Sequence, residues 1–122
     1  MENCIFCKIA AGLIPSKKVF EDEHVIAFHD INPQAPVHVL LVPKKHLVTF
    51  ADIGPEDGPL MVSMARAAKE AAAATGVLES GYRLLVNNGP DAHQEVLHLH
   101  MHLFGGRDLS WMIRRPKSEI GG

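Results

Sequence analysis

The sequence has few cysteines, no long apolar run and no surplus of basic residues. Its two cysteines, Cys4 and Cys7, lie three positions apart, whereas a small secreted domain held by disulfides would need more of them at wider spacing. The longest apolar runs, such as residues 36–43, match a strand in length and are far too short to cross a membrane. The net charge is −2, so neither a nucleic-acid-binding surface nor a polybasic membrane patch is indicated.

The chain has 122 residues, 47% of them hydrophobic, which suits one domain with a hydrophobic core. It starts with neither the basic region nor the apolar region of a secretory signal. We therefore expect a single cytoplasmic domain over residues 1–122, without a nucleic-acid or membrane partner. The stretch from about residue 107 onward has no clear periodicity and is expected to be partly irregular, with Trp111 as a candidate core anchor.

Apolar patterning predicts about five short strands and one long helix. The helix spans Glu56 to Thr75, where apolar residues recur every three or four positions and Gly76 supplies a stop. A shorter helical turn covers Ile5 to Ala11, and the apolar run from Val37 to Val42 is typical of a strand in the middle of a sheet. The remaining strands are expected at residues 18–21, 25–29, 81–87 and 97–104. These elements predict an α+β domain with a largely antiparallel sheet.

Three histidines alternate with apolar residues in the run from Leu97 to Phe104. As a strand, this run places His98, His100 and His102 in one row on one face, whereas a helix would scatter them. The other face of the strand would be apolar and could pack on a core: Leu97, Leu99, Met101 and Leu103.

A single buried histidine can be an ordinary core residue, but a row of three needs a row of partners. Histidines in a row can bind a metal ion, but the outer pair would lie roughly 13 Å apart along a strand, so we do not expect all three to share one ion. Imidazole also attacks phosphorus or acyl carbon, and His100 has a neighbour on each side. Asn87, Gln94 and the turn at Gly89 add groups that suit a phosphate. From the row alone, the metal and the nucleophile interpretations both stay open.

Cys4 and Cys7 have the spacing of a zinc knuckle. A closed tetrahedral site needs two more ligands. The candidates outside the histidine row are His24, His29, His38, His46 and His93. The alternative is two reduced thiols that pack as small hydrophobes, and a redox dithiol fits less well without a thioredoxin-like context.

The run from His98 to Phe104 resembles the signature of the histidine triad (HIT) superfamily, in which three histidines alternate with apolar residues. Four further stretches resemble blocks of the same family in the same order, at residues 4–9, 28–38, 42–46 and 105–107. The nearest branch is the nucleotide-binding, nucleoside phosphoramidase-like hydrolases. The resemblance implies a five-stranded antiparallel sheet with one long helix and a short N-terminal helix. It also implies a homodimer with a continuous ten-stranded sheet.

The resemblance implies a hydrolase that cleaves a purine nucleoside phosphoramidate, such as adenosine 5'-phosphoramidate, or a related nucleotidyl ester. A nucleotidyl-histidine intermediate would form and water would release the nucleoside monophosphate. His100 matches the nucleophile, His102 a phosphate contact and Gln94 a residue near the leaving group. Asn87 matches a further phosphate contact, and Asp30 matches the carboxylate that receives the ribose hydroxyls.

The resemblance also assigns the remaining site residues. His38 matches a further histidine close to the catalytic row. The residues that match the base pocket are Phe6, Ile9, Phe28, His29 and Ile31. Members with a Cys-x-x-Cys start hold a structural zinc ion through four residues, which correspond here to Cys4, Cys7, His46 and His98. No organic cofactor is implied.

One stretch departs from the pattern, because His93-Gln94-Glu95 stands where many relatives have Gly-Gln-Ser or Gly-Gln-Thr. His93 would crowd the leaving-group side, and the Glu95 carboxylate would repel a phosphate unless it were turned away or paired. Two alternatives to the phosphoramidase remain open. One is a dinucleoside polyphosphate hydrolase, a branch that usually lacks the Cys-x-x-Cys start. The other is a nucleotide-binding regulatory or scaffold protein with incidental activity.

Overall fold

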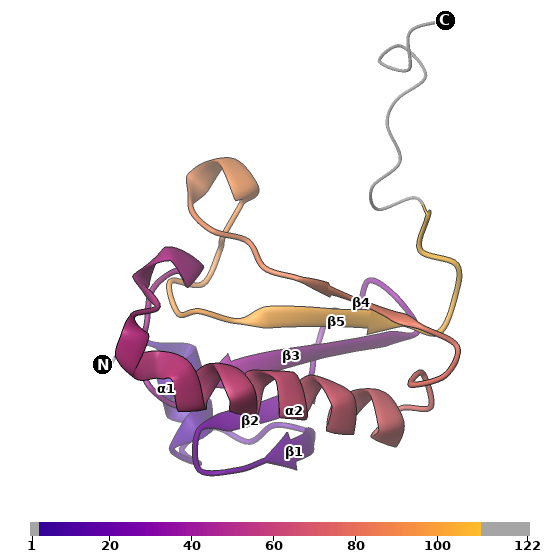
Figure 1. The fold of residues 1–122 in the computed structure, drawn as a ribbon, viewed down its shortest axis with the longest axis horizontal. Coiled ribbons are helices and arrows are strands. Elements are labelled where there is room, and N and C mark those ends of the chain that lie inside the picture. Colours follow the sequence, from indigo (N-terminus) through magenta and orange to yellow (C-terminus); the bar gives the residue numbers. More distant parts are fainter. Residues whose placement is uncertain (1–2, 111–122) are drawn as a thin grey trace, which may run out of the picture.

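In the computed structural model, which describes residues 3–110, five antiparallel strands form one sheet in the order β1-β2-β3-β5-β4 (Figure 1). The strands are β1 (Lys18–Glu21), β2 (Val25–His29), β3 (Val37–Pro43), β4 (Tyr82–Leu85) and β5 (Met101–Gly105). The helices are α1 (Ile5–Ala10) and α2 (Gly58–Ala74). The predicted α+β class is therefore confirmed, and β3 lies in the middle of the sheet as its apolar run indicates. Trp111, expected as a core anchor, and the rest of the tail lie beyond the residues that the structure describes.

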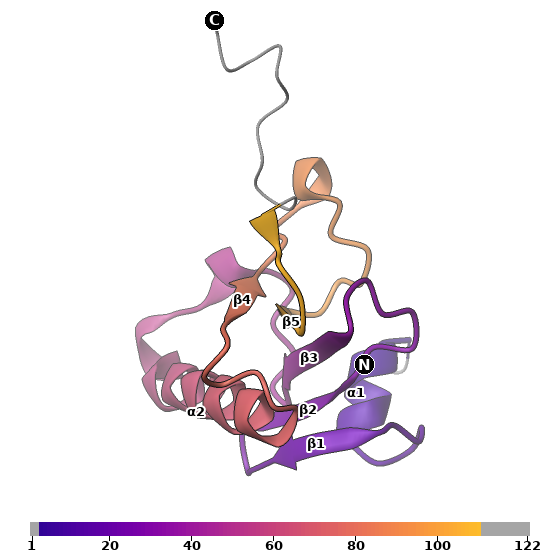
Figure 2. The same cartoon turned by 90° about the vertical axis from the view of Figure 1, so that its right-hand side faces the viewer.

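The two faces of the sheet carry two separate cores, and Figure 2 shows α1 and α2 on opposite sides of the strands. Successive residues of a strand point to opposite faces. On β3, Val39 and Leu41 therefore pack in the α2 core, while Leu40 and Val42 pack in the α1 core. His38 shares the parity of Leu40, and Leu40 pairs with His102 on β5. The α1 face of the sheet is therefore the one that presents His38 and His102.

Helix α2 lies on the sheet through a stripe of small side chains. Its first turn follows a 3₁₀ turn (Pro55–Asp57), and Gly76 supplies the left-handed residue after its last turn, with φ of 79°. Because Ala is small and a strong helix former, the helix can approach the strands closely. The buried alanines are Ala67, Ala68, Ala71 and Ala72. Within residues 3–110, neither helix is long and apolar enough to span a bilayer.

Strand β5 begins four residues later than the predicted strand, which started at Leu97. Residues 97–100 leave the sheet, and the Leu99 N–H donates to the Leu47 carbonyl at 2.6 Å instead of joining the ladder. Leu97 is 64% exposed, so the prediction that it faces a core was wrong. The row of three histidines is therefore split: only His102 lies in the strand, and His98 and His100 lie in the segment that leads into it.

Candidate functional site

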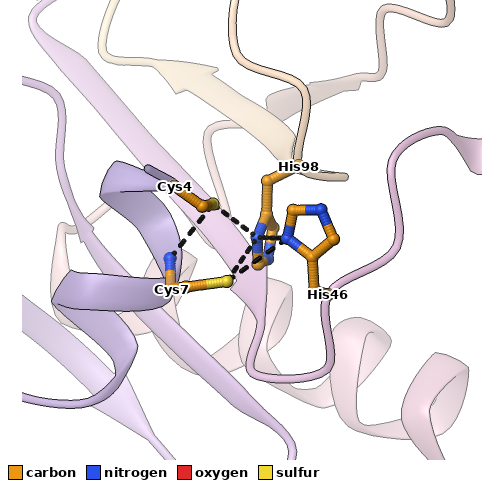
Figure 3. A group of neighbouring side chains, drawn as sticks. All are labelled: Cys4, Cys7, His46 and His98. Carbon is orange, nitrogen blue, oxygen red and sulfur yellow. Dashed lines mark hydrogen bonds between the residues drawn. The ribbon is translucent and has the colours of Figure 1, made fainter. Parts of the chain in front are cut away.

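Two cysteines and two histidines converge at the N-terminal end of α1 (Figure 3). Cys4 Sγ lies 3.2 Å from His98 Nδ1, and Cys7 Sγ lies 3.2 Å from His46 Nδ1. The two Nδ1 atoms are 3.1 Å apart, and all four ligand atoms lie within 4.8 Å of one another. The structure thus brings together the four residues predicted as metal ligands.

Local structure aims these four side chains at one point. Cys4 caps α1, and its Sγ accepts the Cys7 N–H at 3.3 Å, so the first helical turn places both sulfurs on one side. His98 is fully buried, and its Nε2–H donates to the Pro43 carbonyl at 2.7 Å. The lone pair of a neutral His98 ring is therefore on Nδ1, the atom that faces the cysteines.

The chemistry of this donor set fits a metal ion. Thiols are weak hydrogen-bond donors, so they satisfy two converging imidazole nitrogens poorly. Burial, and then the neighbouring Cys4, raise the pKa of the Cys7 thiol, an effect that a bound cation reverses. Two sulfurs and two imidazole nitrogens make a closed four-coordinate set. The four residues therefore form a candidate metal site, and we refer to Cys4, Cys7, His46 and His98 as the metal cluster.

A second group of histidines lines a cleft of about 390 Å³ on the α1 face of the sheet. We call it the histidine cleft; the residues that line it include Asp30, His38, Asn87, His100 and His102. His100 is 8% exposed, and its Nδ1–H donates to the His98 carbonyl at 2.7 Å. This bond leaves the Nε2 atom of His100 with a free lone pair, which is the state that an imidazole nucleophile requires. Phe6 holds the ring edge-on, with ring centroids 5.0 Å apart.

His102 lies beside His100 and is held as a neutral ring. Burial is the largest cause that lowers the pKa of His102 to about 4, with further lowering from His100 and His38 and an opposing effect from Asp30. Its ring stacks on Phe104, with centroids 5.6 Å apart and planes inclined by 4°. At neutral pH, His102 is therefore a rigid, uncharged imidazole next to the candidate nucleophile.

A larger cleft of about 750 Å³, which we call the outer cleft, adjoins the histidine cleft. Four residues predicted for the base pocket line it: Ile9, Phe28, His29 and Ile31. Phe6, the fifth, lines the histidine cleft instead. Asp30 and His38 line both clefts, so a ligand could extend from one into the other. Ile31 is 92% exposed, and an apolar side chain open to solvent beside a cleft is available to pack on a flat ligand.

Gln94 does not line either cleft. Its amide N–H groups donate to the Val48 carbonyl at 2.6 Å and the Val96 carbonyl at 3.1 Å. Its Oε1 accepts the Gly89 N–H at 2.9 Å. The side chain thus braces two loops, and its contact with a leaving group stays a prediction. Sequence reasoning instead missed Gln34, whose backbone N–H donates to His38 Nδ1 at 3.1 Å and which no side-chain motif could have revealed.

Comparison with known proteins identifies the family. A family model described as the HIT domain matches residues 11–109. The chain belongs to the HIT family. It is 49% identical over 105 residues to Protein HitA of Neisseria gonorrhoeae, covering 86% of this chain and 97% of that protein.

Solved HIT structures agree with this fold. A structure named as a HIT family hydrolase from Legionella pneumophila is 50% identical, with a TM-score of 0.85 over 89% of this chain and 97% of its own. A histidine triad nucleotide-binding protein from Candida albicans is 38% identical, with a TM-score of 0.78 over 87% of this chain and 76% of its own. The five-stranded sheet and long helix are therefore those of the HIT fold.

In this HIT chain, two residues at the rim of the histidine cleft are unusual in chemistry or backbone geometry. His93 has φ of 60°, which places a side chain other than glycine in the left-handed region. Glu95 adds a second carboxylate to the lining of the cleft, which already contains Asp30. Both rim residues are exposed, so they can reorient when a ligand enters.

Proposed function

We propose that this HIT protein hydrolyses a purine nucleoside phosphoramidate, such as adenosine 5'-phosphoramidate, through a nucleotidyl group carried on His100. The supporting observation is the bond from His100 Nδ1–H to the His98 carbonyl at 2.7 Å, because it leaves the Nε2 lone pair free for attack on phosphorus. Attack forms a bond between Nε2 and phosphorus and breaks the bond to the amine, which departs after taking up a proton. Water then cleaves the bond between Nε2 and phosphorus and releases the nucleoside monophosphate.

The two clefts divide the substrate between them in this proposal. The base and ribose occupy the outer cleft, where Phe28 and Ile31 offer apolar surface and Asp30 accepts the ribose hydroxyls. The α-phosphate lies in the histidine cleft beside His100, where His102 and Asn87 supply hydrogen bonds. His29 and Ile9 complete the base pocket, and His38 lies at the junction of the clefts.

Electrostatics favour an amine leaving group over a phosphate leaving group. Among the described residues that line the histidine cleft, two are carboxylates, Asp30 and Glu95, and none is Lys or Arg. A polyphosphate chain carries several negative charges and would be repelled there, whereas a departing ammonium group would be attracted. This charge pattern supports the phosphoramidase proposal over a dinucleoside polyphosphate hydrolase.

We also propose that the metal cluster binds a structural zinc ion, since two cysteines and two histidines are a common tetrahedral zinc set. The ion would link α1 to the segment that carries His98. The protein is further proposed to act as a homodimer. Sedimentation at working concentration tests this, and a monomer would contradict it.

The decisive experiment compares the parent protein with His100→Ala on adenosine 5'-phosphoramidate and on diadenosine polyphosphates. Loss of the nucleophile should lower kcat/KM for the phosphoramidate by about 10⁴-fold. His24→Ala serves as the control, because His24 lines neither the outer cleft nor the histidine cleft, and its activity should equal that of the parent.

Three results would contradict the proposal. Equal rates for the parent and His100→Ala would remove the nucleophile assignment. A preference of the parent for polyphosphates would assign the protein to the other hydrolase branch. Nucleotide binding without turnover would indicate a regulatory or scaffold protein.

A further inference from the structure

The main chain determines which nitrogen of His38 carries the proton. His38 is 4% exposed, and its Nδ1 lies 3.1 Å from the backbone N–H of Gln34, which donates to it. A backbone N–H can only donate, so Nδ1 of His38 must hold a lone pair. Burial also lowers the pKa of His38, which keeps the ring neutral. A neutral ring with a lone pair on Nδ1 carries its proton on Nε2.

That proton faces two acceptors. His38 Nε2 lies 2.9 Å from His102 Nδ1 and 3.4 Å from Asp30 Oδ2. The first distance is normal for a hydrogen bond and the second is long, so His102 is the principal acceptor. Donation in the reverse direction would require a His38 ring without any proton. His102 must therefore accept on Nδ1 and hold its own proton on Nε2.

We propose that His38 is a positioning residue: its donation to Nδ1 fixes His102 with the proton on Nε2, from which His102 donates to a phosphoryl oxygen of the substrate. His102 lines the histidine cleft beside His100, with ring centroids 5.1 Å apart. Since His38 occupies Nδ1, Nε2 is the ring nitrogen of His102 that remains for a ligand. That the acceptor of the His102 Nε2–H is a phosphoryl oxygen rests on the proposed function, whereas the tautomer of His102 does not.

The arrangement solves a conflict between the two neighbouring rings. Attack by His100 needs a neutral imidazole, because a protonated ring has no lone pair. A His102 ring that exchanged freely between tautomers would present a donor at Nε2 for only part of the time, unless it were protonated. With its tautomer fixed by His38, His102 can donate at the same pH at which His100 can attack.

Nitrogen NMR of the full chain with ¹⁵N-labelled histidine rings tests the proposal without substrate. The His102 signals are assigned by their loss in His102→Gln. In the parent at neutral pH, Nδ1 of His102 should have the shift of an unprotonated nitrogen and Nε2 that of a protonated one. His38→Phe retains an aromatic ring against Phe104, whose centroid lies 4.2 Å from that of His38, but it lacks the donor. It should show a mixture of His102 tautomers.

His38→Gln restores an N–H donor and should return the spectrum toward that of the parent, while His24→Phe should leave the His102 signals unchanged. On the phosphoramidate, kcat/KM should fall about tenfold in His38→Phe and recover partly in His38→Gln. A proton on Nδ1 of His102 in the parent would overturn the proposal, even if His38→Phe failed to fold. An unchanged His102 tautomer in a folded His38→Phe would also overturn it. If the parent shows the expected tautomer but cleaves no phosphoramidate, the proposed function fails and the tautomer assignment stands.

Discussion

The neutral state of His102 predicts a pH dependence of folding stability. Its pKa is about 4 in the native protein, against about 6.5 for an unfolded histidine. Between these values the unfolded chain binds more protons than the native chain, so the free energy of unfolding falls as the pH is lowered. Integrated from pH 7 to pH 4, the contribution of His102 is about 3 kcal/mol.

The assay compares the parent with His102→Gln, which retains a polar side chain but does not titrate. Urea unfolding, followed by circular dichroism at several pH values, gives the free energy of unfolding of each protein. The difference between the two curves reports the contribution of His102 together with any change at His38, to which His102 is hydrogen-bonded. The parent should lose about 3 kcal/mol more than His102→Gln between pH 7 and pH 4. Parallel curves would show that the fold does not hold His102 neutral, and the reasoning would be refuted.

Two further predictions concern the metal cluster and the rim of the histidine cleft. Elemental analysis of protein purified under reducing, chelator-free conditions should find one zinc ion per chain in the parent and less in Cys7→Ser; absence of zinc from the parent would reject the site. Glu95→Gln should raise kcat/KM for diadenosine polyphosphates about fivefold relative to the phosphoramidate, because it removes one repelling charge at an exposed position. Glu23→Gln, which is outside both named clefts, should leave that ratio unchanged, and an equal ratio in all three proteins would argue against electrostatic selection.

The alternation of apolar and polar residues, together with the turn residues between the segments, was sufficient to predict most of the fold. Strands β1 and β2 occupy the ranges that apolar patterning indicates, since each is bounded by polar turns. The long run of β3 is apolar because both its faces are covered, one by α1 and the other by α2. These features follow from local periodicity and from the need to bury both faces of a central strand.

The start of β5 could not be predicted in this way, because non-local contacts decide it. Leu97 and Leu99 continue the alternation of the strand, yet the Leu99 N–H is engaged by Leu47, a residue of the loop after β3. His98 is likewise drawn to Pro43 by the bond from its ring. Periodicity within one segment contains no information about a loop fifty residues earlier in the chain.

Gln94 shows a similar limit for the site. A family pattern indicates that an amide belongs at this position, but the same amide can contact a ligand or bridge loops. Here all three of its hydrogen bonds go to backbone groups, including the Val48 carbonyl and the Gly89 N–H. The residue type was informative, whereas its partners depended on how two distant loops meet.

His98 joins the metal cluster to the candidate nucleophile through a single residue. Its Nδ1 faces Cys4 and Cys7, its Nε2 is held by Pro43, and its carbonyl accepts the Nδ1–H of His100. The residue whose ring faces the metal cluster therefore also supplies the carbonyl that sets the tautomer of His100. Phe6 contacts both histidines as well. It lies on α1 between the two cysteines in sequence and packs edge-on against the rings of His98 and His100. Two of the three histidines of the triad thus connect the metal cluster to the candidate nucleophile through adjacent backbone and side-chain hydrogen bonds, although the two sites use different atoms.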